Sequence, residues 1–182
     1  MKNYLFIPIL ILVMNGFAKA QNIWSSKNAS ISFFSSTVVE DIEGKSNTAS
    51  SALDVKSGNM IFKVYNNSFQ FKKKLMQEHF NENYMESEKY PISEFKGRII
   101  EPLDLSKPGS RKVTVEGNLT IHGLSKTYRT TADLVTENGA MTAKAVFKVK
   151  IADHNIEIPS LVFKNIAEFV EIRILATYFP KK

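Results

Sequence analysis

Strict alternation of apolar and polar residues is the feature of this chain that most constrains its fold. Segments 112–121, 141–151 and 170–178 place apolar side chains at every second position, with Lys, Thr, Glu and Arg between them. A period of two is typical of a strand with one buried face and one solvated face, as in an antiparallel sheet. The chain therefore has to bury one face of an extended sheet.

Turn-forming residues divide the sequence into many such strands. Clusters of Gly, Asn, Ser, Pro and charged residues at 43–47, 56–59, 106–110 and 137–139 predict turns. Further strands are expected at 30–35, 37–42, 49–55, 59–65, 68–72, 94–100 and 127–135. Roughly eight to ten antiparallel strands in one domain close into a barrel or stack as a sandwich, because open edges promote aggregation.

Two local signals refine this pattern. Asn138-Gly139 is a two-residue hairpin signal between the strand that ends near Val135 and the strand that begins near Met141. Pro159 is expected to end an edge strand, and residues 160–168 are expected to form a short helical turn before the last strand.

Small residues interrupt the alternating faces. Ala143 and Ala145 occur among larger apolar residues, and Gly117 separates Val115 from Leu119. Small inward residues can leave room for a ligand inside a barrel, or they can accommodate large side chains from the opposite wall. The pattern alone leaves both interpretations open.

The first twenty residues have the composition of a secretory signal peptide. Lys2 is followed by an apolar run from Tyr4 to Met14, and Ala18-Lys19-Ala20 is an A-x-A-like cleavage site. The run is shorter than the roughly 20 residues that cross a bilayer, so a cleaved signal is favoured over an anchor. We expect a periplasmic or secreted mature protein of residues 21–182, forming one domain and not spanning a membrane.

Composition limits the partners of the mature chain. The full chain has a formal net charge of +6, and loss of Lys2 and Lys19 with the signal peptide leaves about +4; this charge is mixed along the sequence, with no basic stripe interleaved with aromatic residues, so nucleic acid is not the expected partner. There is no cysteine, which excludes a disulfide framework. A homodimer remains open.

The stretch from Leu75 to Pro91, LMQEHFNENYMESEKYP, predicts a single amphipathic helix. Met76, Phe80 and Tyr84 align on a helical wheel, and Leu75 and His79 form the neighbouring row. Met85 falls among the polar residues on the other side. Pro91 disfavours helical geometry at Tyr90, so the helix has to end before that residue.

The polar residues of this helix do not form a recognisable catalytic or metal site. A second histidine four residues after His79 would be needed for a zinc helix, and position 83 is Asn. Three scattered histidines without cysteine lack the spacing of a structural zinc site, and no nucleophile motif or phosphate loop is present. We therefore expect no metal, no cofactor and no enzymatic activity. His79 is either a half-buried structural residue or a donor at the mouth of a pocket.

Three sequence segments resemble the YceI-like family of exported bacterial proteins. The first combines Ser68-Phe69-Gln70-Phe71 with Leu75-Met76-Gln77-Glu78-His79-Phe80. The second is EKYPISEFKG at 88–97, which is similar to the family's Tyr-Pro-x-x-x-Phe-Lys strand start. The third, VEGNLTIHGLSK at 115–126, is similar to its G-x-L-T-I-x-G-V-T-K signature, and Leu53-Asp54 resembles an earlier strand end.

The chain also departs from the family pattern near the histidine. Met76-Gln77-Glu78 takes the place where the family often has an Arg-Asp pair, and Phe80 replaces the usual Leu. The interval from His79 to Pro91 is about one residue shorter than the common pattern. Ligand identity therefore does not transfer closely from the family.

The resemblance implies an all-β domain with one or two short helices, folded as an antiparallel lipocalin-like β-barrel. It further implies an exported lipid-binding protein that holds an elongated apolar ligand of polyisoprenoid or isoprenoid-quinone type. The candidate ligand-binding residues are Phe69, Phe71, Leu75, Met76, His79, Phe80, Tyr84, Phe147 and Val149. The alternative is an envelope interaction or stress-response protein with a packed barrel and no ligand.

Overall fold

The computed structural model describes residues 22–158 and 166–181. The expected signal peptide, Pro159 and most of the helical turn expected at 160–168 lie outside the described residues. The expected strand count was correct, because the described chain contains nine strands in one antiparallel sheet.

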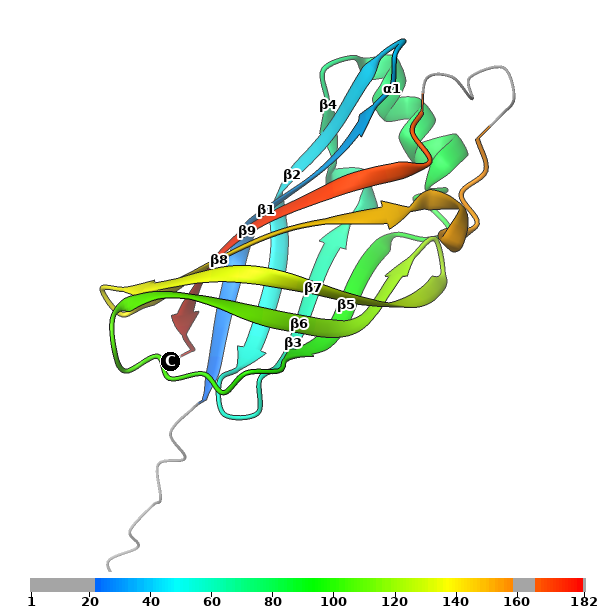
Figure 1. Ribbon diagram of the computed structural model, residues 1–182. Helices are drawn as coiled ribbons and strands as arrows, with labels where there is room; N and C mark the ends of the chain where they lie inside the picture. The colour runs from blue at the N-terminus through cyan, green and yellow to red at the C-terminus, as the bar shows by residue number, and fades with distance from the viewer. Residues whose placement is uncertain (1–21, 159–165, 182) are drawn as a thin grey trace, which may run out of the picture.

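The sheet closes on itself as a β-barrel (Figure 1). Around the ring the order is β1-β9-β8-β7-β6-β5-β3-β2, and β2 pairs again with β1. Of the strands in the described residues, the short β4 alone lies outside the ring, paired with β2. The bounds are β1 Ile23–Ser36, β2 Asp41–Asp54, β3 Asn59–Tyr65, β4 Gln70–Phe71, β5 Ile92–Ile99, β6 Gly109–Ile121, β7 Leu124–Glu137, β8 Ala140–Lys150 and β9 Phe169–Pro180. Closure pairs the strand edges that would otherwise promote aggregation.

The helical elements gather at one end of the barrel, which we call the cap end (Figure 1). They are η1 Asn66–Ser68, α1 Lys74–His79, the π-helix η2 Phe80–Tyr84 and η3 Ile151–His154. The β1–β2 and β6–β7 connections lie at the same end. The opposite end, which we call the base, carries the β2–β3 turn, the β5–β6 loop and the β7–β8 hairpin.

The first hairpin was predicted in the wrong place. The expected strand at 37–42 is the loop between β1 and β2 together with the first residues of β2, and the expected turn at 43–47 lies inside β2. Gly44 has no positive φ. A side chain there would collide with the rings of Phe33 and Phe71, so the glycine serves close packing of these rings and not a turn.

Other turn predictions are confirmed. Asn138 and Gly139 both have positive φ, 50° and 75°, and join β7 to β8 by a two-residue turn. After β2, the Asp54 carboxylate accepts hydrogen bonds from the backbone of Lys56 and Ser57, which fixes the turn into β3. The strand expected at 68–72 is shorter than predicted, because η1 occupies Asn66–Ser68 and only Gln70–Phe71 pair.

The base half of the barrel interior is filled. Its largest fully buried apolar side chains are Leu53, Leu134 and Met141. Tyr178 is also buried, and its hydroxyl lies 2.8 Å from Ser51 Oγ, which itself donates to Ile61 O at 2.7 Å. Leu103 and Leu105 of the β5–β6 loop pack against this core. Every polar group that this chain of hydrogen bonds buries therefore has a partner.

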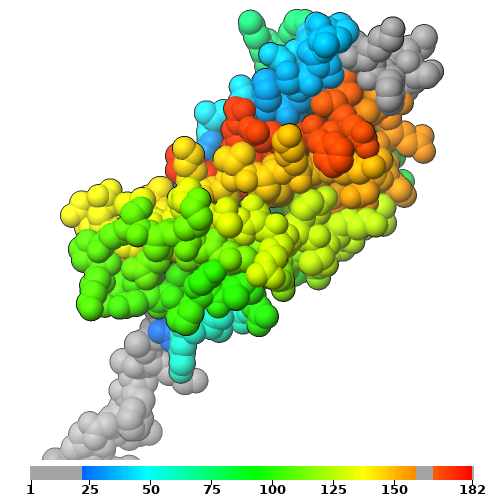
Figure 2. Space-filling model, in the orientation of Figure 1, coloured from blue at the N-terminus to red at the C-terminus, as the bar shows by residue number. Residues whose placement is uncertain are grey.

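The residues that alternate with the inward side chains lie on the outer face of the barrel and are exposed, as along β7. In Figure 2 the side chains of β6, β7, β8 and β9 cover one side of the barrel without a gap. Within residues 22–158 and 166–181, no helix combines the length and apolar character that a membrane crossing requires.

Candidate ligand-binding cavity

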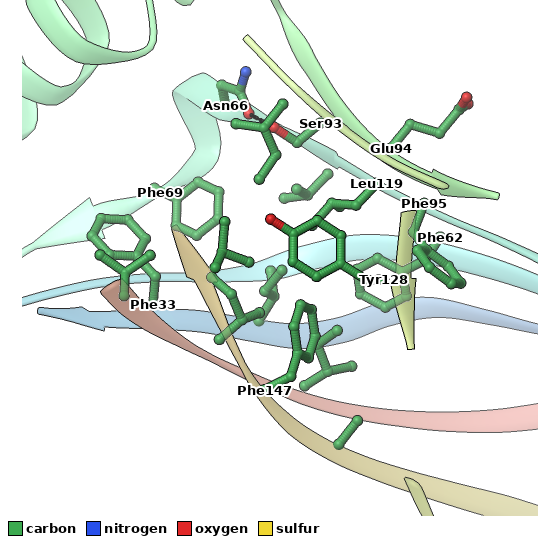
Figure 3. Close-up of a pocket in the computed structure, with 18 of the residues that line it drawn as sticks. Phe33, Phe62, Asn66, Phe69, Ser93, Glu94, Phe95, Leu119, Tyr128 and Phe147 are labelled. Atoms are coloured by element: carbon green, nitrogen blue, oxygen red, sulfur yellow. Dashed lines mark hydrogen bonds between the residues drawn. The ribbon is translucent and has the colours of Figure 1, made fainter. Parts of the chain in front are cut away.

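An apolar cavity of about 320 Å³ occupies the barrel interior. Its wall includes inward residues of all the ring strands and residues of the helical segment at the cap end. Figure 3 shows Phe33, Phe69 and Phe147 from different elements pointing toward a common space. The volume is at the lower end of the roughly 300–1,000 Å³ found for small-molecule sites.

Burial along the strands locates the hollow part of the interior. The inward residues of β7 change from half-buried at Tyr128 and Thr130 to buried at Ala132 and Leu134. The inward residues of β9 change in the same way, from Ile172 and Ile174 to Ala176. Since these side chains face the barrel interior, the accessible surface that remains on the half-buried ones faces the cavity. The cavity is therefore widest in the cap half, whereas tightly packed base residues such as Leu134, Met141 and Ala176 close its floor.

Both interpretations of the small residues apply, at different positions. Ala143 and Ala145 line the cavity and are only half-buried, so they leave space. Gly117 is paired with Gly97, and a side chain on either would collide with the ring of Phe95. These two glycines therefore make room for a neighbouring aromatic side chain and not for a ligand.

Four phenylalanines close the cap end, and we call them the aromatic cap: Phe33, Phe69, Phe71 and Phe80. Their ring centroids lie 5.0 to 5.6 Å apart, and Phe33 stacks on Phe80 at an interplanar angle of 18°. Aromatic pairs at such distances contribute roughly 0.5–1.5 kcal/mol beyond their area burial. The aromatic cap therefore attaches the helical segment to β1 and β4.

The helical segment differs from the expected single α-helix. After α1, the amide of Met85 donates to Phe80 O at 2.8 Å, the spacing of a π-helical turn. The wider turn brings Met85 back over the side of Phe80, and Met85 is only 5% exposed. The prediction that Met85 belongs to the polar side was wrong for this reason.

Leu75 also needs correction. It was expected on the apolar side of the helix, but its side chain is 60% exposed and does not line the cavity. Within the six residues of α1, Met76 and His79 line the cavity, and Leu75 turns outward.

The structure brings the other candidate residues together on the cavity wall. They are Phe69, Phe71, Met76, His79, Phe80, Tyr84, Phe147 and Val149. Phe33 was missed, although it alternates with the outward Phe34 in β1. The period-two pattern of Ser32-Phe33-Phe34-Ser35 was a signal for one inward phenylalanine, without indicating which one.

The polar members of the wall are few. His79 is exposed at the cap end, and the described residues give its ring no hydrogen-bond partner. Burial raises the pKa of the Tyr84 phenol, so this side chain stays neutral at physiological pH. Within the described ranges, no group of three or more His, Cys, Asp or Glu side chains is arranged to hold a metal ion.

A polar junction fastens the helical segment to the far side of the cap end. His122, in the β6–β7 turn, places Nε2 2.7 Å from the Glu86 carboxylate and Nδ1 3.2 Å from His154 O. The hydrogen bond from His122 is the main reason why the pKa of Glu86 lies below its ordinary value. Glu86 and His122 have positive φ, 43° and 49°, in a region that non-glycine residues rarely adopt. The junction thus holds a strained backbone in place.

A closed antiparallel barrel with an apolar interior and a helical cap defines a lipocalin-like class of protein. The model of the YceI-like domain matches residues 24–178, so the chain belongs to the YceI-like domain family. This match spans β1 to β9 and includes the cavity wall just described.

Solved structures share this fold. A polyisoprenoid-binding domain from Saccharophagus degradans superposes with a TM-score of 0.73 at 15% identity, covering 87% of this chain and 98% of that one. BcnA from Burkholderia cenocepacia gives 0.69 at 19% identity, covering 82% and 95%. A Campylobacter jejuni YceI protein gives 0.55 at 16% identity, covering 100% and 99%. A search of curated proteins found no match.

Proposed function

We propose that this chain is an exported carrier that holds an elongated apolar ligand in the cap half of its barrel, without making or breaking a covalent bond. The observation that carries this proposal is the cavity itself. Its wall consists of aliphatic and aromatic side chains from every strand of the ring, with few polar groups. A wall of this composition suits a chain lipid, which offers apolar surface along its whole length.

Burial of apolar surface is the expected source of affinity. Each methylene removed from water contributes about 0.8 kcal/mol before the cost of ordering the ligand. Half-buried wall residues such as Ile172, Ile174 and Phe147 would lose their remaining solvent contact when the cavity fills. Binding thus needs no acid, base or metal.

The proposed ligand class is a polyisoprenoid or an isoprenoid quinone. The Saccharophagus degradans domain with the same fold is described as polyisoprenoid-binding. Isoprenoid chains are branched at regular intervals, which suits a wall that combines small residues such as Ala143 and Ala145 with bulky ones such as Phe147.

The proposed location is the periplasm or the extracellular space. The support is the basic start, apolar run and Ala18-Lys19-Ala20 site of the first twenty residues. A carrier outside the cytoplasm would shield an insoluble chain from water between membranes or proteins.

The direct test is to purify the mature protein from its native host, extract it with organic solvent and search for a stoichiometric lipid by mass spectrometry. We expect one prenyl-type lipid per barrel. An empty extract, together with no uptake of prenyl chains in native mass spectrometry, would contradict the carrier and favour the packed-barrel interaction protein.

A matched pair of variants tests whether the cap holds the ligand. Phe80→Asp puts a carboxylate into the aromatic cap, and we expect retention of the bound lipid to fall by at least roughly tenfold, because a buried unpaired charge is costly. Leu75→Asp, five residues earlier on the exposed side, is the control and should retain lipid normally. Equal retention by both variants would show that the helical segment does not contact the ligand.

A further inference from the structure

Tyr128 is a polar residue of the cavity wall whose hydroxyl is held in a defined orientation. This residue of β7 faces inward in the hollow half of the barrel. Its ring packs against Phe147 at a centroid distance of 6.1 Å and stacks on His154 at 6.0 Å with an interplanar angle of 11°. In Figure 3 the Tyr128 ring lies in the middle of the lining residues, between Phe69 and Phe62.

His154 determines the direction of the hydrogen bond to this tyrosine. His154 is fully buried at the end of η3, with Nδ1 3.0 Å from Leu124 O and Nε2 3.1 Å from the Tyr128 hydroxyl. A carbonyl oxygen only accepts, so Nδ1 carries the proton and Nε2 of the neutral ring is an acceptor. Burial lowers the pKa of His154, which favours this neutral ring. Tyr128 therefore donates its proton to His154.

The Tyr128 oxygen then keeps lone pairs for a partner in the cavity. With its own proton engaged by His154, this oxygen can accept a hydrogen bond but cannot donate one. The group that complements it is a donor on a ligand, such as a hydroxyl. A carbonyl or phosphate oxygen offers no proton to this position.

The charged residues of the cavity wall also favour a neutral ligand. The lining residues of the described chain include no Lys or Arg, and their carboxylates are those of Glu40 and Glu94. Each carboxylate is already paired with a lysine: Glu40 Oε1 lies 2.6 Å from Lys73 Nζ, and Glu94 Oε2 lies 2.8 Å from Lys63 Nζ. An anionic head group inside the barrel would find no cation to offset its lost hydration, so it would be strongly disfavoured.

We propose that the cavity selects a neutral apolar chain that carries a hydroxyl group, and that Tyr128, oriented by His154, accepts a hydrogen bond from this hydroxyl. The inference rests on the proposed carrier function and specifies which ligand chemistry it takes. Prenyl phosphates and diphosphates are excluded from the interior, whereas prenyl alcohols fit.

Three probes of the same chain length test the proposal on delipidated mature protein: geranylgeraniol, geranylgeranyl phosphate and the hydrocarbon that lacks the oxygen. Binding is measured for the native chain, for Tyr128→Phe, and for the exposed control Tyr65→Phe. We expect the native protein to bind the alcohol at least roughly tenfold more tightly than the phosphate. Tyr128→Phe should weaken alcohol binding about three- to tenfold and leave hydrocarbon binding unchanged, as the loss of one hydrogen bond predicts.

Each outcome is decisive. Equal binding of alcohol and phosphate, or a Tyr128→Phe variant that lowers alcohol and hydrocarbon affinity by the same factor, would overturn this inference and leave the carrier function standing. No binding of any probe would overturn the carrier function itself and this inference with it. Tyr65→Phe should leave the binding of all three probes unchanged, and a loss of alcohol affinity as large as that of Tyr128→Phe would overturn the assignment of the hydroxyl contact to Tyr128.

Discussion

The two halves of this barrel are built from the same strands but use their inward faces differently. In the base half, Leu134 and Met141 are each 1% exposed, and Tyr178 is hydrogen-bonded to Ser51 beneath the β5–β6 loop. In the cap half, Tyr128 and Ile172 on the same strands are only half-buried and face the cavity. The difference lies in packing and not in secondary structure.

The contrast suggests that the base half mainly stabilises the fold and that the cap half mainly provides space for a ligand. A densely packed base can supply the stability of the whole barrel, because buried apolar area is the main favourable contribution to folding. The cap half forgoes part of that contribution and leaves room for another molecule. A ligand that fills the cap half would then stabilise the protein in proportion to its own burial.

The largest expected effect comes from truncation of a base residue. Leu134→Ala should lower the free energy of unfolding by about 2–5 kcal/mol, because it removes a fully buried side chain and leaves a cavity. Leu119→Ala on the neighbouring strand should cost clearly less in the ligand-free protein, since Leu119 is only half-buried, whereas Leu134 is 1% exposed. Urea denaturation of both variants measures the difference.

Leu119 and Leu134 are matched in residue type and in inward orientation, so the comparison isolates packing. Ligand retention should show the opposite order, with the larger loss in Leu119→Ala. Equal destabilisation by the two variants would show that the cap half is as well packed as the base, and the division into two halves would be abandoned.

The strands and their inward faces could be predicted from the sequence because alternation is a local signal. Val113, Val115 and Met141 are buried as their periodicity indicated. The continuation of β2 through Gly44 could not be predicted in this way. A glycine is needed there because of Phe33 and Phe71, which are distant in sequence. A glycine that serves a close contact has the same local appearance as a glycine that forms a turn.

The cavity wall was predictable only where helical or strand periodicity held. Met76, Phe80 and Tyr84 lie on the wall, but the π-turn changed the side on which Met85 lies. The pairing of Tyr128 with His154 joins residues 26 positions apart and arises because η3 folds over the beginning of β7. No local pattern encodes such a contact.

A smaller effect is expected when alanines in the two halves are enlarged. Ala176 is 1% exposed, so Ala176→Leu should overpack the base and cost about 1–3 kcal/mol of unfolding free energy. Ala145 is half-buried at the cavity, so Ala145→Leu should be nearly neutral for stability in the ligand-free protein. Thermal denaturation of the delipidated variants gives both values.

Ligand binding should separate the same two variants in the other direction. Ala145→Leu occupies space that the chain lipid would use, so its lipid content should fall, whereas folded Ala176→Leu should keep its lipid. A lipid content unaffected by Ala145→Leu would place the ligand elsewhere in the barrel.

The smallest expected effect is a pH dependence confined to the cap half. The pKa of His154 lies below the ordinary value of 6.5, mainly because burial disfavours the charged ring. Between the folded and unfolded pKa values only the unfolded chain binds the proton, so this contribution to stability is complete above 6.5 and decreases as the pH falls. Denaturation midpoints should therefore decrease from about pH 7.5 to pH 5.

His154→Gln tests this assignment, since glutamine keeps a donor and an acceptor but does not titrate. The difference in stability between the native chain and this variant should vary with pH only below about 6.5, and the other histidines cancel in the difference. Amide hydrogen exchange tests where the effect lies: on acidification, η3 and the first residues of β7 should exchange faster, while amides near Leu53 and Met141 in the base should not. Uniform acceleration across both halves would show that they open as one cooperative unit. The packing difference would then affect where a ligand fits without affecting where the barrel opens.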